Sequence, residues 1–461
     1  MLCRENNFFY RLFEIKQGIL WGLLAIICLI TPVSANTAII NTPEKEWTFL
    51  VYAQANNSLC PFAQKNFNDM ATVGSTQDLN IVVQWHDPNH NGVWRYKINA
   101  GKMELDMHLP VNIDGNAAKD LVDSMNWAVS KYPAKKYALI LWNHGIGILD
   151  PVWGNQSMGF TRSKATIANP RVQIEGLTHI EDSPENLTRK QLRKAGHRGI
   201  LFNERTKTYM NNQTLSSALS AIKTTVLKNK KIDLIGMDAC LMAMTEVCYQ
   251  IRNYADFFVG SQEVELAFGW GYAPIVQRFV GKPSPQEAAQ GIVQSYENLY
   301  KSKINFYTQS AIDLKVMDLL RDSINLVIQK LMACREIDQR KTTQALKQAR
   351  NHTLQFSTSA YVDLHSFFQE LHRSFQDIFN KNTTKNPLLT QAVDALKDAI
   401  DIASKLIEQS VVANATGKSL SRAKGLSIYY PLSGPIDQSY MYTEFVADCG
   451  WNNLLLMTQG Y

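Results

Sequence analysis

Cysteine is scarce in this chain, and the spacing of its cysteines argues against several classes of protein. Seven cysteines in 461 residues are too few and too scattered for a disulfide framework. None of them has the spacing of metal ligands, and the lack of a Cys-x-x-Cys pair counts against a thiol oxidoreductase. If Cys240 is a free thiol, a disulfide among Cys60, Cys248, Cys334 and Cys449 stays open on the sequence alone.

The chain also lacks concentrated charge, low-complexity tracts and internal repeats. Its formal net charge of +6 is small for the length and is spread along the sequence, which argues against a nucleic-acid partner. His86 and His90 would share a face only on a helix, and Pro88, Asn91 and Gly92 argue against one. No acidic cluster has the spacing of a calcium loop. We therefore expect neither a metal nor another cofactor.

Long hydrophobic runs are absent except at the amino end. Basic residues precede an apolar run from Gly18 to Ile30, and Pro32 and small residues ending at Ala35 follow it. This is the organisation of a secretory signal peptide, and the run is too short for a comfortable membrane span. We predict that residues 1–35 are a signal peptide and that the mature protein is exported, either secreted or periplasmic, with no membrane attachment. An uncleaved anchor is the alternative.

The rest of the chain alternates apolar, strand-like runs with helical patterns, which predicts an α/β fold with a mostly parallel sheet. Strands are expected at 47–52, 79–85, 93–98, 137–142, 199–202, 232–237 and 257–260. Helices are expected at 59–73, 116–132, 214–227, 241–252, 285–301, 312–334, 341–350, 361–380 and 387–412.

This pattern predicts two regions after the signal peptide. Residues 36–280 form the expected core, and residues 281–461 form a mainly helical region packed on it, which returns one strand at 425–431. Within the core, residues 150–212 have the composition of a long basic loop, with ten Lys or Arg and five acidic residues between 151 and 212. Loops of this length in a compact domain are usually functional or mobile.

Two of the expected strands end in residues that can carry chemistry. The run at 139–145 ends in His144 and Gly145, and the run at 232–240 ends in Cys240. If these strands are parallel neighbours, the thiol and the imidazole meet at the same edge of the sheet, where open α/β sheets bind ligands. That arrangement would be a nucleophile with its base.

Three further residues would complete such a site. Gly145 leaves its backbone N–H open to a developing oxyanion. A helix beginning at Leu241 would stabilise a Cys240 thiolate through its N-terminus. Asp238 lies two residues before the thiol, on the same side of an extended strand, where a carboxylate can receive a cationic side chain of a substrate. A lone cysteine or histidine at a strand end is, however, more often a structural residue.

Several motifs together resemble the clostripain family of cysteine endopeptidases, whose clan also holds caspases, legumains and gingipains. The two defining segments are LILWNHG at 139–145 and IDLIGMDAC at 232–240. Further matching segments are WTFLVYAQANN (47–57), DACLMAMTEV (238–247), SQEVELAFGWGY (261–272), YVDLHSF (361–367) and GLSIYYP (425–431). The resemblance extends over nearly the whole chain after the signal peptide, from about 47 to 456.

The resemblance implies a caspase-like α/β/α sandwich in which His144 and Cys240 are the catalytic dyad. It also implies that the N–H groups of Gly145 and Cys240 form the oxyanion hole. Asp238 would be the acid of the primary specificity pocket, which implies cleavage after Arg, with Lys as a second candidate. The expected partners are therefore proteins or peptides with basic residues.

Some members of the family cleave themselves between the two defining segments. The predicted loop at 150–212 offers basic candidate sites in the matching place, which are Arg189, Arg193, Arg198 and Arg205. Calcium dependence is a trait of only some relatives, so the resemblance leaves calcium open.

The chain departs from the family pattern at two places. The family loop usually reads Glu-Pro-Gly-Asp-Gly-Trp, whereas residues 265–270 read Glu-Leu-Ala-Phe-Gly-Trp, so an acid is replaced by Phe268. Asn56 and Asn57 stand where relatives often have an Asp-rich turn. The changed loop and the large helical second half support an alternative, a non-catalytic secreted or surface interaction protein on the same fold.

Overall fold

The computed structural model describes residues 44–89, 92–109, 117–150, 200–379 and 386–459. The predicted signal peptide and residues 151–199 of the predicted basic loop lie outside these ranges. No helix within the described ranges is long and apolar enough to cross a membrane.

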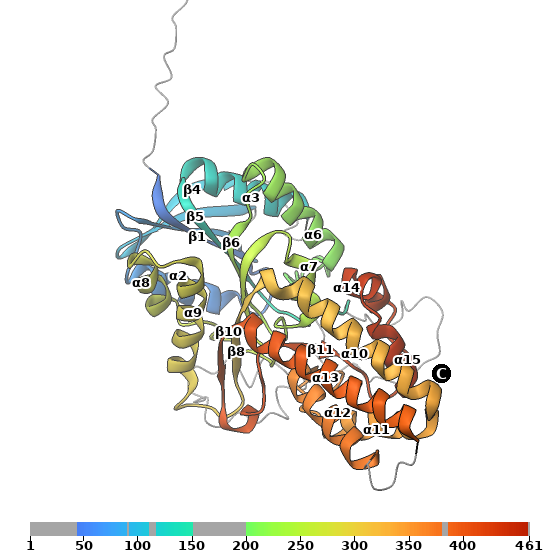
Figure 1. The fold of residues 1–461 in the computed structure, drawn as a ribbon. Helices are drawn as coiled ribbons and strands as arrows, with labels where there is room; N and C mark the ends of the chain where they lie inside the picture. Colours follow the sequence, from blue (N-terminus) through green and yellow to red (C-terminus); the bar gives the residue numbers. More distant parts are fainter. Residues whose placement is uncertain (1–43, 90–91, 110–116, 151–199, 380–385, 460–461) are drawn as a thin grey trace, which may run out of the picture. The chain divides into compact units, whose positions relative to one another are not determined.

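A nine-stranded sheet carries the fold, with the strand order β10, β8, β7, β6, β5, β1, β2, β3, β4 (Figure 1). The strands are β1 (Lys45–Gln54), β2 (Leu79–His86), β3 (Val93–Asn99), β4 (Lys102–Leu109), β5 (Ala134–Trp142), β6 (Ile232–Asp238), β7 (Ala255–Gly260), β8 (Thr308–Asp313) and β10 (Val411–Thr416). The strands from β7 to β2 pair in parallel, and the strands outside them pair antiparallel. The predicted α/β fold with a mostly parallel sheet is confirmed.

Alternate residues of the central strands supply two separate cores. In β1, Phe49 and Val51 belong to one hydrophobic cluster, while Leu50 and Tyr52 belong to the other. This follows from the two-residue period of a strand, which sends successive side chains to opposite faces of the sheet. Both faces of these strands are covered. Their sequences are therefore continuous apolar runs, without the alternation of a strand that has one face in water.

Helices cover both faces of the sheet, as an α/β/α sandwich requires. One core includes residues of α3 (Ala118–Lys131), α6 (Asn212–Ala221), α7 (Thr245–Ile251) and α10 (Met317–Ile337). The other includes residues of α2 (Cys60–Ala71), α8 (Tyr272–Val280) and α9 (Pro285–Tyr300). The arrangement implied by the family resemblance is thus present.

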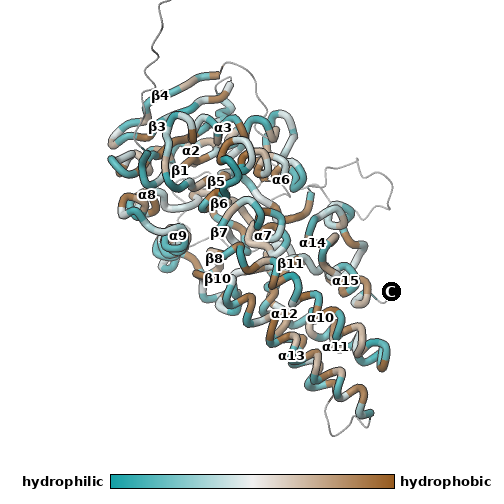
Figure 2. Tube along the Cα trace, turned by 45° about the horizontal axis from the view of Figure 1, so that its top comes forward, coloured by the Kyte–Doolittle hydropathy of each residue, from teal (hydrophilic) through white to brown (hydrophobic). Residues whose placement is uncertain are grey.

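The second half of the chain adds a group of long helices beside the sheet (Figure 1). They are α10, α11 (Gln339–His352), α12 (Leu364–Ile378) and α13 (Pro387–Ser410), followed by α14 (Glu444–Asp448) and α15 (Trp451–Gln459). Hydrophobic and hydrophilic residues alternate along α11, α12 and α13 in Figure 2, as expected of helices that bury one side.

Three strands of the main sheet, β4, β8 and β10, come from stretches that the sequence pattern did not assign to strands. β8 ends at Asp313, where a helix beginning at 312 was expected, and β10 begins at Val411, where the helix at 387–412 was expected to end. Pairing with β7 fixes β8 as a strand, and β8 in turn pairs with β10. The predicted returning strand at 425–431 is present as β11 (Ser427–Tyr429), which pairs with β9 (Tyr361–Asp363) in a separate small sheet. The division of the chain at 280/281 stays a prediction.

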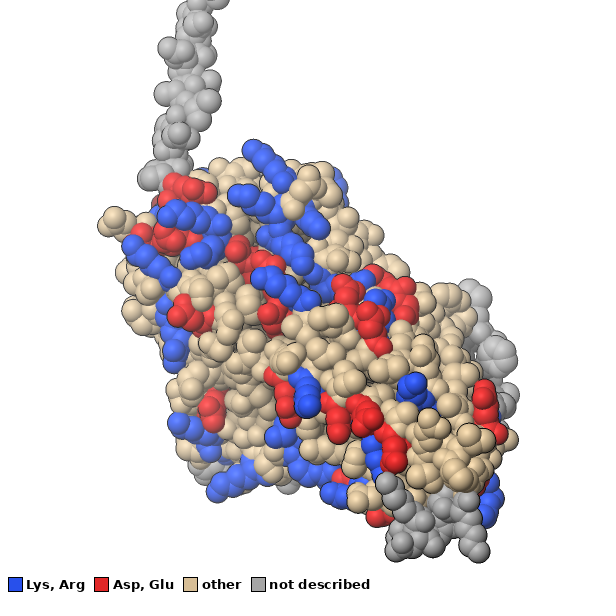
Figure 3. Space-filling view, in the orientation of Figure 1, with Lys and Arg blue, Asp and Glu red and all other residues tan. Residues whose placement is uncertain are grey.

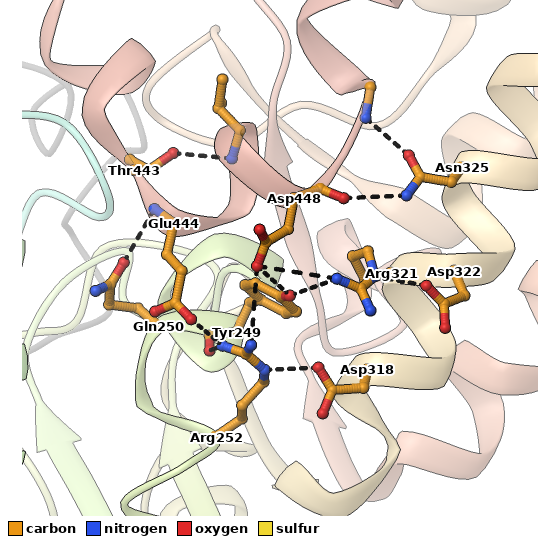
Figure 4. A network of polar contacts seen from close by, with 12 residues as sticks. Tyr249, Gln250, Arg252, Asp318, Arg321, Asp322, Asn325, Thr443, Glu444 and Asp448 are labelled. Atoms are coloured by element: carbon orange, nitrogen blue, oxygen red, sulfur yellow. Dashed lines mark hydrogen bonds and ion pairs between the residues drawn. The ribbon is translucent and has the colours of Figure 1, made fainter.

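A polar network fastens α7 to α10 and α14 (Figure 4). The Arg252 guanidinium donates to Asp318 at 2.8 Å and to Glu444 at 2.7 Å, and its Cζ lies 3.5 Å from the centroid of the Tyr249 ring. The Tyr249 hydroxyl donates to Asp448 at 2.8 Å. Arg252 is only 9% exposed, whereas the side chains of Asp318 and Glu444 are 57% and 34% exposed, so solvent screens these ion pairs in part.

Charges of both signs are intermixed on the face shown in Figure 3. Ion pairs such as Lys135 with Glu46 and Lys282 with Asp78 lie at the surface. Exposed pairs of this kind add little to stability, so the fold rests mainly on the two buried cores.

Candidate active site

The register of β5 and β6 brings the two candidate residues to one edge of the sheet. Trp142 pairs with Asp238 in the parallel ladder, and His144 and Cys240 each follow two residues later. The Asn143 N–H donates to the Asp238 carbonyl at 3.3 Å, which continues the pairing beyond the strand ends. The structure therefore places the imidazole and the thiol on adjacent loops, as the sequence predicts.

Gly145 lies directly against the backbone that carries the thiol. A Cβ atom built on Gly145 would lie 2.5 Å from the Cys240 carbonyl oxygen and 3.0 Å from Ala239 Cβ. A side chain here would push the two loops apart. This position thus requires glycine for close packing, in addition to the oxyanion role expected from the sequence.

The surroundings of Cys240 correct one prediction. The helix expected from Leu241 begins at Thr245, and Leu241 itself has a φ of 65°, in the left-handed region. The N-terminus of α7 therefore does not directly follow the thiol. Burial is the main cause that raises the pKa of Cys240, to about 12. The resting thiol is protonated at neutral pH.

Hydrogen bonds hold the thiol against the loop at 263–272. The Glu265 N–H donates to Cys240 Sγ at 3.3 Å, and the Glu265 carbonyl oxygen lies 3.7 Å from the same sulfur. Cys240 is half-buried, whereas Cys60, Cys248, Cys334 and Cys449 are buried. All five are free thiols, so the disulfide left open by the sequence does not form.

Asp238 is covered by the same loop. It is 5% exposed and accepts hydrogen bonds from the Tyr272 hydroxyl at 2.8 Å and from the Trp270 N–H at 3.3 Å. A Cβ atom on Gly269 would lie 2.8 Å from Asp238 Oδ2. One loop therefore contacts both the nucleophile and the candidate specificity residue, which places them on the same side of β6.

Glu265 is a site residue that the sequence analysis did not single out. It is 7% exposed, and Trp270 contacts both its carboxyl group and that of Asp238, through Nε1 to Glu265 Oε1 at 3.4 Å and through its N–H to Asp238 Oδ2 at 3.3 Å. Burial raises the pKa of Glu265 well above its usual value and also raises the pKa of Asp238. Only the folding of residues 265–272 back over β6 reveals this contact. The one signal in the sequence was that Glu265 stands directly before the residues that depart from the family pattern.

An asparagine pair that the sequence analysis did not assign to the site fixes the loop of His144. Asn143 Oδ1 accepts the His144 N–H, and Asn143 Nδ2 donates to the Phe202 carbonyl at 3.0 Å. Asn57 Nδ2 donates to the same carbonyl at 2.8 Å and to Asn143 Oδ1 at 3.1 Å. Residues 200 and 201 form a turn rather than the expected strand. The Met210 N–H donates to the Ile200 carbonyl at 3.0 Å, and the two asparagine side chains hold the Phe202 carbonyl.

Phe268, which stands where the family usually has an acid, packs toward α2. Its ring makes an edge-to-face contact with Phe62 at 5.4 Å between centroids, and Lys65 Nζ lies 4.6 Å from its centroid. The Asn66 side chain donates to the Phe268 carbonyl at 3.2 Å. The substitution therefore anchors the loop to α2 by apolar contacts.

No group of three or more His, Cys, Asp or Glu residues in the described ranges is placed to hold a metal ion. His86 Nε2 pairs with Asp120 at 2.9 Å inside the protein, and His90 lies outside the described residues.

Comparisons with known proteins agree with the fold and with the family resemblance. A family model described as the clostripain family matches residues 51–164 and 188–456. No curated protein matches the chain. Among solved structures, a secreted cysteine protease from Bacteroides thetaiotaomicron in complex with an irreversible peptide inhibitor aligns with a TM-score of 0.58 and 19% identity. The alignment covers 88% of this chain and 100% of that one.

An inactive zymogen protease from Parabacteroides distasonis gives a TM-score of 0.56 and 18% identity, over 88% of this chain and 99% of that one. At these identities the two structures show a shared fold. The family model, in contrast, matches well over half of the chain. This protein therefore belongs to the clostripain family of cysteine peptidases.

Proposed function

We propose that this peptidase is an exported endopeptidase that cleaves after Arg, and also after Lys, through a dyad of Cys240 and His144. The observation that carries the proposal is the register of β5 and β6, which sets His144 and Cys240 on adjacent loops. The contact of Gly145 with the Cys240 carbonyl keeps those loops together.

The chemistry follows from the protonated state of the resting thiol. His144 accepts the Cys240 proton as the sulfur bonds to the scissile carbonyl carbon, and the N–H groups of Gly145 and Cys240 stabilise the oxyanion. The imidazolium then gives its proton to the leaving amine as the C–N bond breaks, which leaves an acyl-enzyme. Water hydrolyses this thioester, with His144 accepting its proton, and the thiol is restored.

Asp238 supports the preference for a basic residue before the scissile bond. A carboxylate this deeply buried gains from pairing with a cation that offsets its desolvation. Arg fits best because its planar guanidinium can hydrogen-bond a carboxylate through two N–H groups.

Export and self-cleavage complete the proposal. The signal-like segment at 1–35 supports export, and one similar structure is described as a secreted protease. Another is described as a zymogen, and the basic residues between 151 and 199 supply cleavage sites for a similar activation here. A cut there would leave the new amino end anchored through Phe202, whose carbonyl accepts the two asparagine side chains. Mass spectrometry of the purified protein would locate both processing sites.

Hydrolysis of Arg- and Lys-terminated reporter peptides tests the function. The wild type should cleave both, and Cys240→Ala should abolish cleavage. Cys60→Ser is the matched control, because Cys60 is a buried thiol that bonds to Asp87 at 3.3 Å and a hydroxyl can keep that bond. Full activity in Cys240→Ala would overturn the proposal. Inactivity of the intact and trypsin-nicked wild type would favour the non-catalytic alternative.

A further inference from the structure

Trp270 contacts the carboxyl groups of both Asp238 and Glu265 inside the protein, through its N–H to Asp238 Oδ2 at 3.3 Å and through Nε1 to Glu265 Oε1 at 3.4 Å. The two residues are 5% and 7% exposed, so water contributes little to the pair. Burial raises the pKa of both carboxyl groups, and two neighbouring carboxylates would also repel each other. We therefore expect one of the two groups to be a protonated carboxylic acid that can donate to the other.

The surrounding donors identify which group keeps the proton. Asp238 Oδ2 accepts two donors, the Tyr272 hydroxyl at 2.8 Å and the Trp270 N–H at 3.3 Å. Glu265 Oε2, in contrast, is buried and meets no donor in the described part of the chain. The geometry therefore favours an Asp238 carboxylate that is stabilised by donors and a Glu265 acid whose proton points to it.

The other side of Glu265 is held by neutral groups. Trp270 Nε1 lies 3.4 Å from Glu265 Oε1, and the Gln309 amide, oriented to satisfy both of its ends, donates to the same oxygen at 3.1 Å. Burial and the charge of Asp238 both raise the pKa of Glu265. The two acids raise the pKa values of four neighbouring titratable groups, which are Cys240, Tyr272, Tyr296 and Tyr300. None of these described residues is a cation.

We propose that Glu265 is a second specificity-determining residue, a protonated acid that donates to Asp238 and fixes that carboxylate for one cationic substrate side chain. The proposal rests on the basic specificity proposed above. The pair carries a single negative charge in this state, which matches one guanidinium or ammonium group. Glu265 thus acts through Asp238 and not as a second anion.

Substitutions of Glu265 require a control, because the backbone N–H and carbonyl of this residue both contact Cys240 Sγ. A change of side chain could disturb the nucleophile as well as the pocket. The alkylation rate of Cys240 by iodoacetamide reports on the thiol without using the pocket. Variants whose alkylation rate equals that of the wild type can therefore be compared for specificity alone.

The test compares reporter peptides that end in Arg or in citrulline, its uncharged isostere. The wild type should prefer Arg by at least about 100-fold in kcat/KM. Glu265→Gln, which keeps a neutral donor, should hold this ratio within about threefold, and Glu265→Leu should lower it at least about 10-fold, mainly by raising KM for Arg. Asp238→Asn should remove most of the preference.

Two results would overturn the inference while basic specificity stands. One is an unchanged ratio in Glu265→Leu, and the other is a loss in Glu265→Gln as large as that expected for the leucine variant, which would mark Glu265 as an anion. If Glu265→Leu fails to fold, Glu265→Gln alone decides whether Glu265 is a neutral acid or an anion in the wild type. A wild type that does not prefer Arg over citrulline would overturn the proposed specificity and the inference together.

Discussion

At the scale of single residues, the site combines a thiol and two acids whose pKa values are all raised. Burial raises the pKa of Cys240 and also the pKa values of Glu265 and Asp238 beside it. In the proposed mechanism the thiol is unreactive at rest, and His144 accepts its proton only as the sulfur bonds to the scissile carbonyl carbon.

This account predicts how Cys240 reacts with iodoacetamide as the pH changes. Because burial raises the pKa of the thiol to about 12, the thiolate is scarce at pH 7. The alkylation rate should rise about tenfold for each pH unit below that pKa. Peptide mapping after short exposures between pH 6 and 10 would measure it. A fast rate that is constant from pH 5 to 8 would contradict the prediction, since a thiolate–imidazolium pair behaves that way.

Gly145 offers a second test at this scale. Gly145→Ala should lower kcat/KM by at least about 100-fold with the fold retained, because its Cβ would lie 2.5 Å from the Cys240 carbonyl and separate the two loops. Gly450→Ala is the matched control, since its nearest contact would be an ordinary 3.5 Å. A Gly145→Ala enzyme with near wild-type kcat/KM would show that the loops need not touch.

At the scale of elements, the central strands were predictable, whereas β4, β8, β10 and the loops at the site were not. The apolar runs that form β5 and β6 identified the strands, and the shared edge followed from parallel pairing. The helix expected from Leu241 starts later because Leu241 adopts a positive φ, which local sequence does not reveal. The Asp238–Glu265 contact depends on how residues 265–272 fold back, and no pattern in the sequence specifies that path.

Residues 200–210, the described end of the predicted basic loop, supply a prediction about elements. Asn143→Ala should loosen them, because it removes one of the two donors to the buried Phe202 carbonyl and the acceptor of the His144 N–H. Each hydrogen bond lost costs about 0.5–1.5 kcal/mol. Hydrogen exchange of the 200–210 amides should accelerate, and kcat should fall. Unchanged exchange would mean that Asn57 alone holds the segment.

At the scale of the whole molecule, the site is embedded in a sheet that the second half of the chain completes. β8 and β10 extend the sheet beyond β7, and β11 packs beside α7. Glu246 of α7 links these parts, since it accepts the Tyr429 N–H at 2.8 Å and the Tyr440 hydroxyl at 3.1 Å. The local sequence around Glu246 could not predict this contact, because its partners lie more than 180 residues away.

Glu246 should make stability depend on pH. Burial raises its pKa from 4.5 to about 7, so the folded protein binds this proton more tightly than the unfolded chain does. The free energy of unfolding should therefore fall as pH rises from about 4.5 to 7, by about 3 kcal/mol from this group. Urea unfolding at pH 5 and pH 8 measures the change. Glu246→Gln should show a smaller difference, and an equal difference would exclude Glu246 as the cause.

The central claim is that Cys240 is the nucleophile of a site that selects basic residues, and an arginyl chloromethylketone tests it most directly. The account predicts that mass spectrometry finds one equivalent of the probe on Cys240, with activity lost in proportion. Excess Arg reporter should protect, and the citrulline reporter should not. Labelling of another residue, or full activity in a protein labelled at Cys240, would contradict the account.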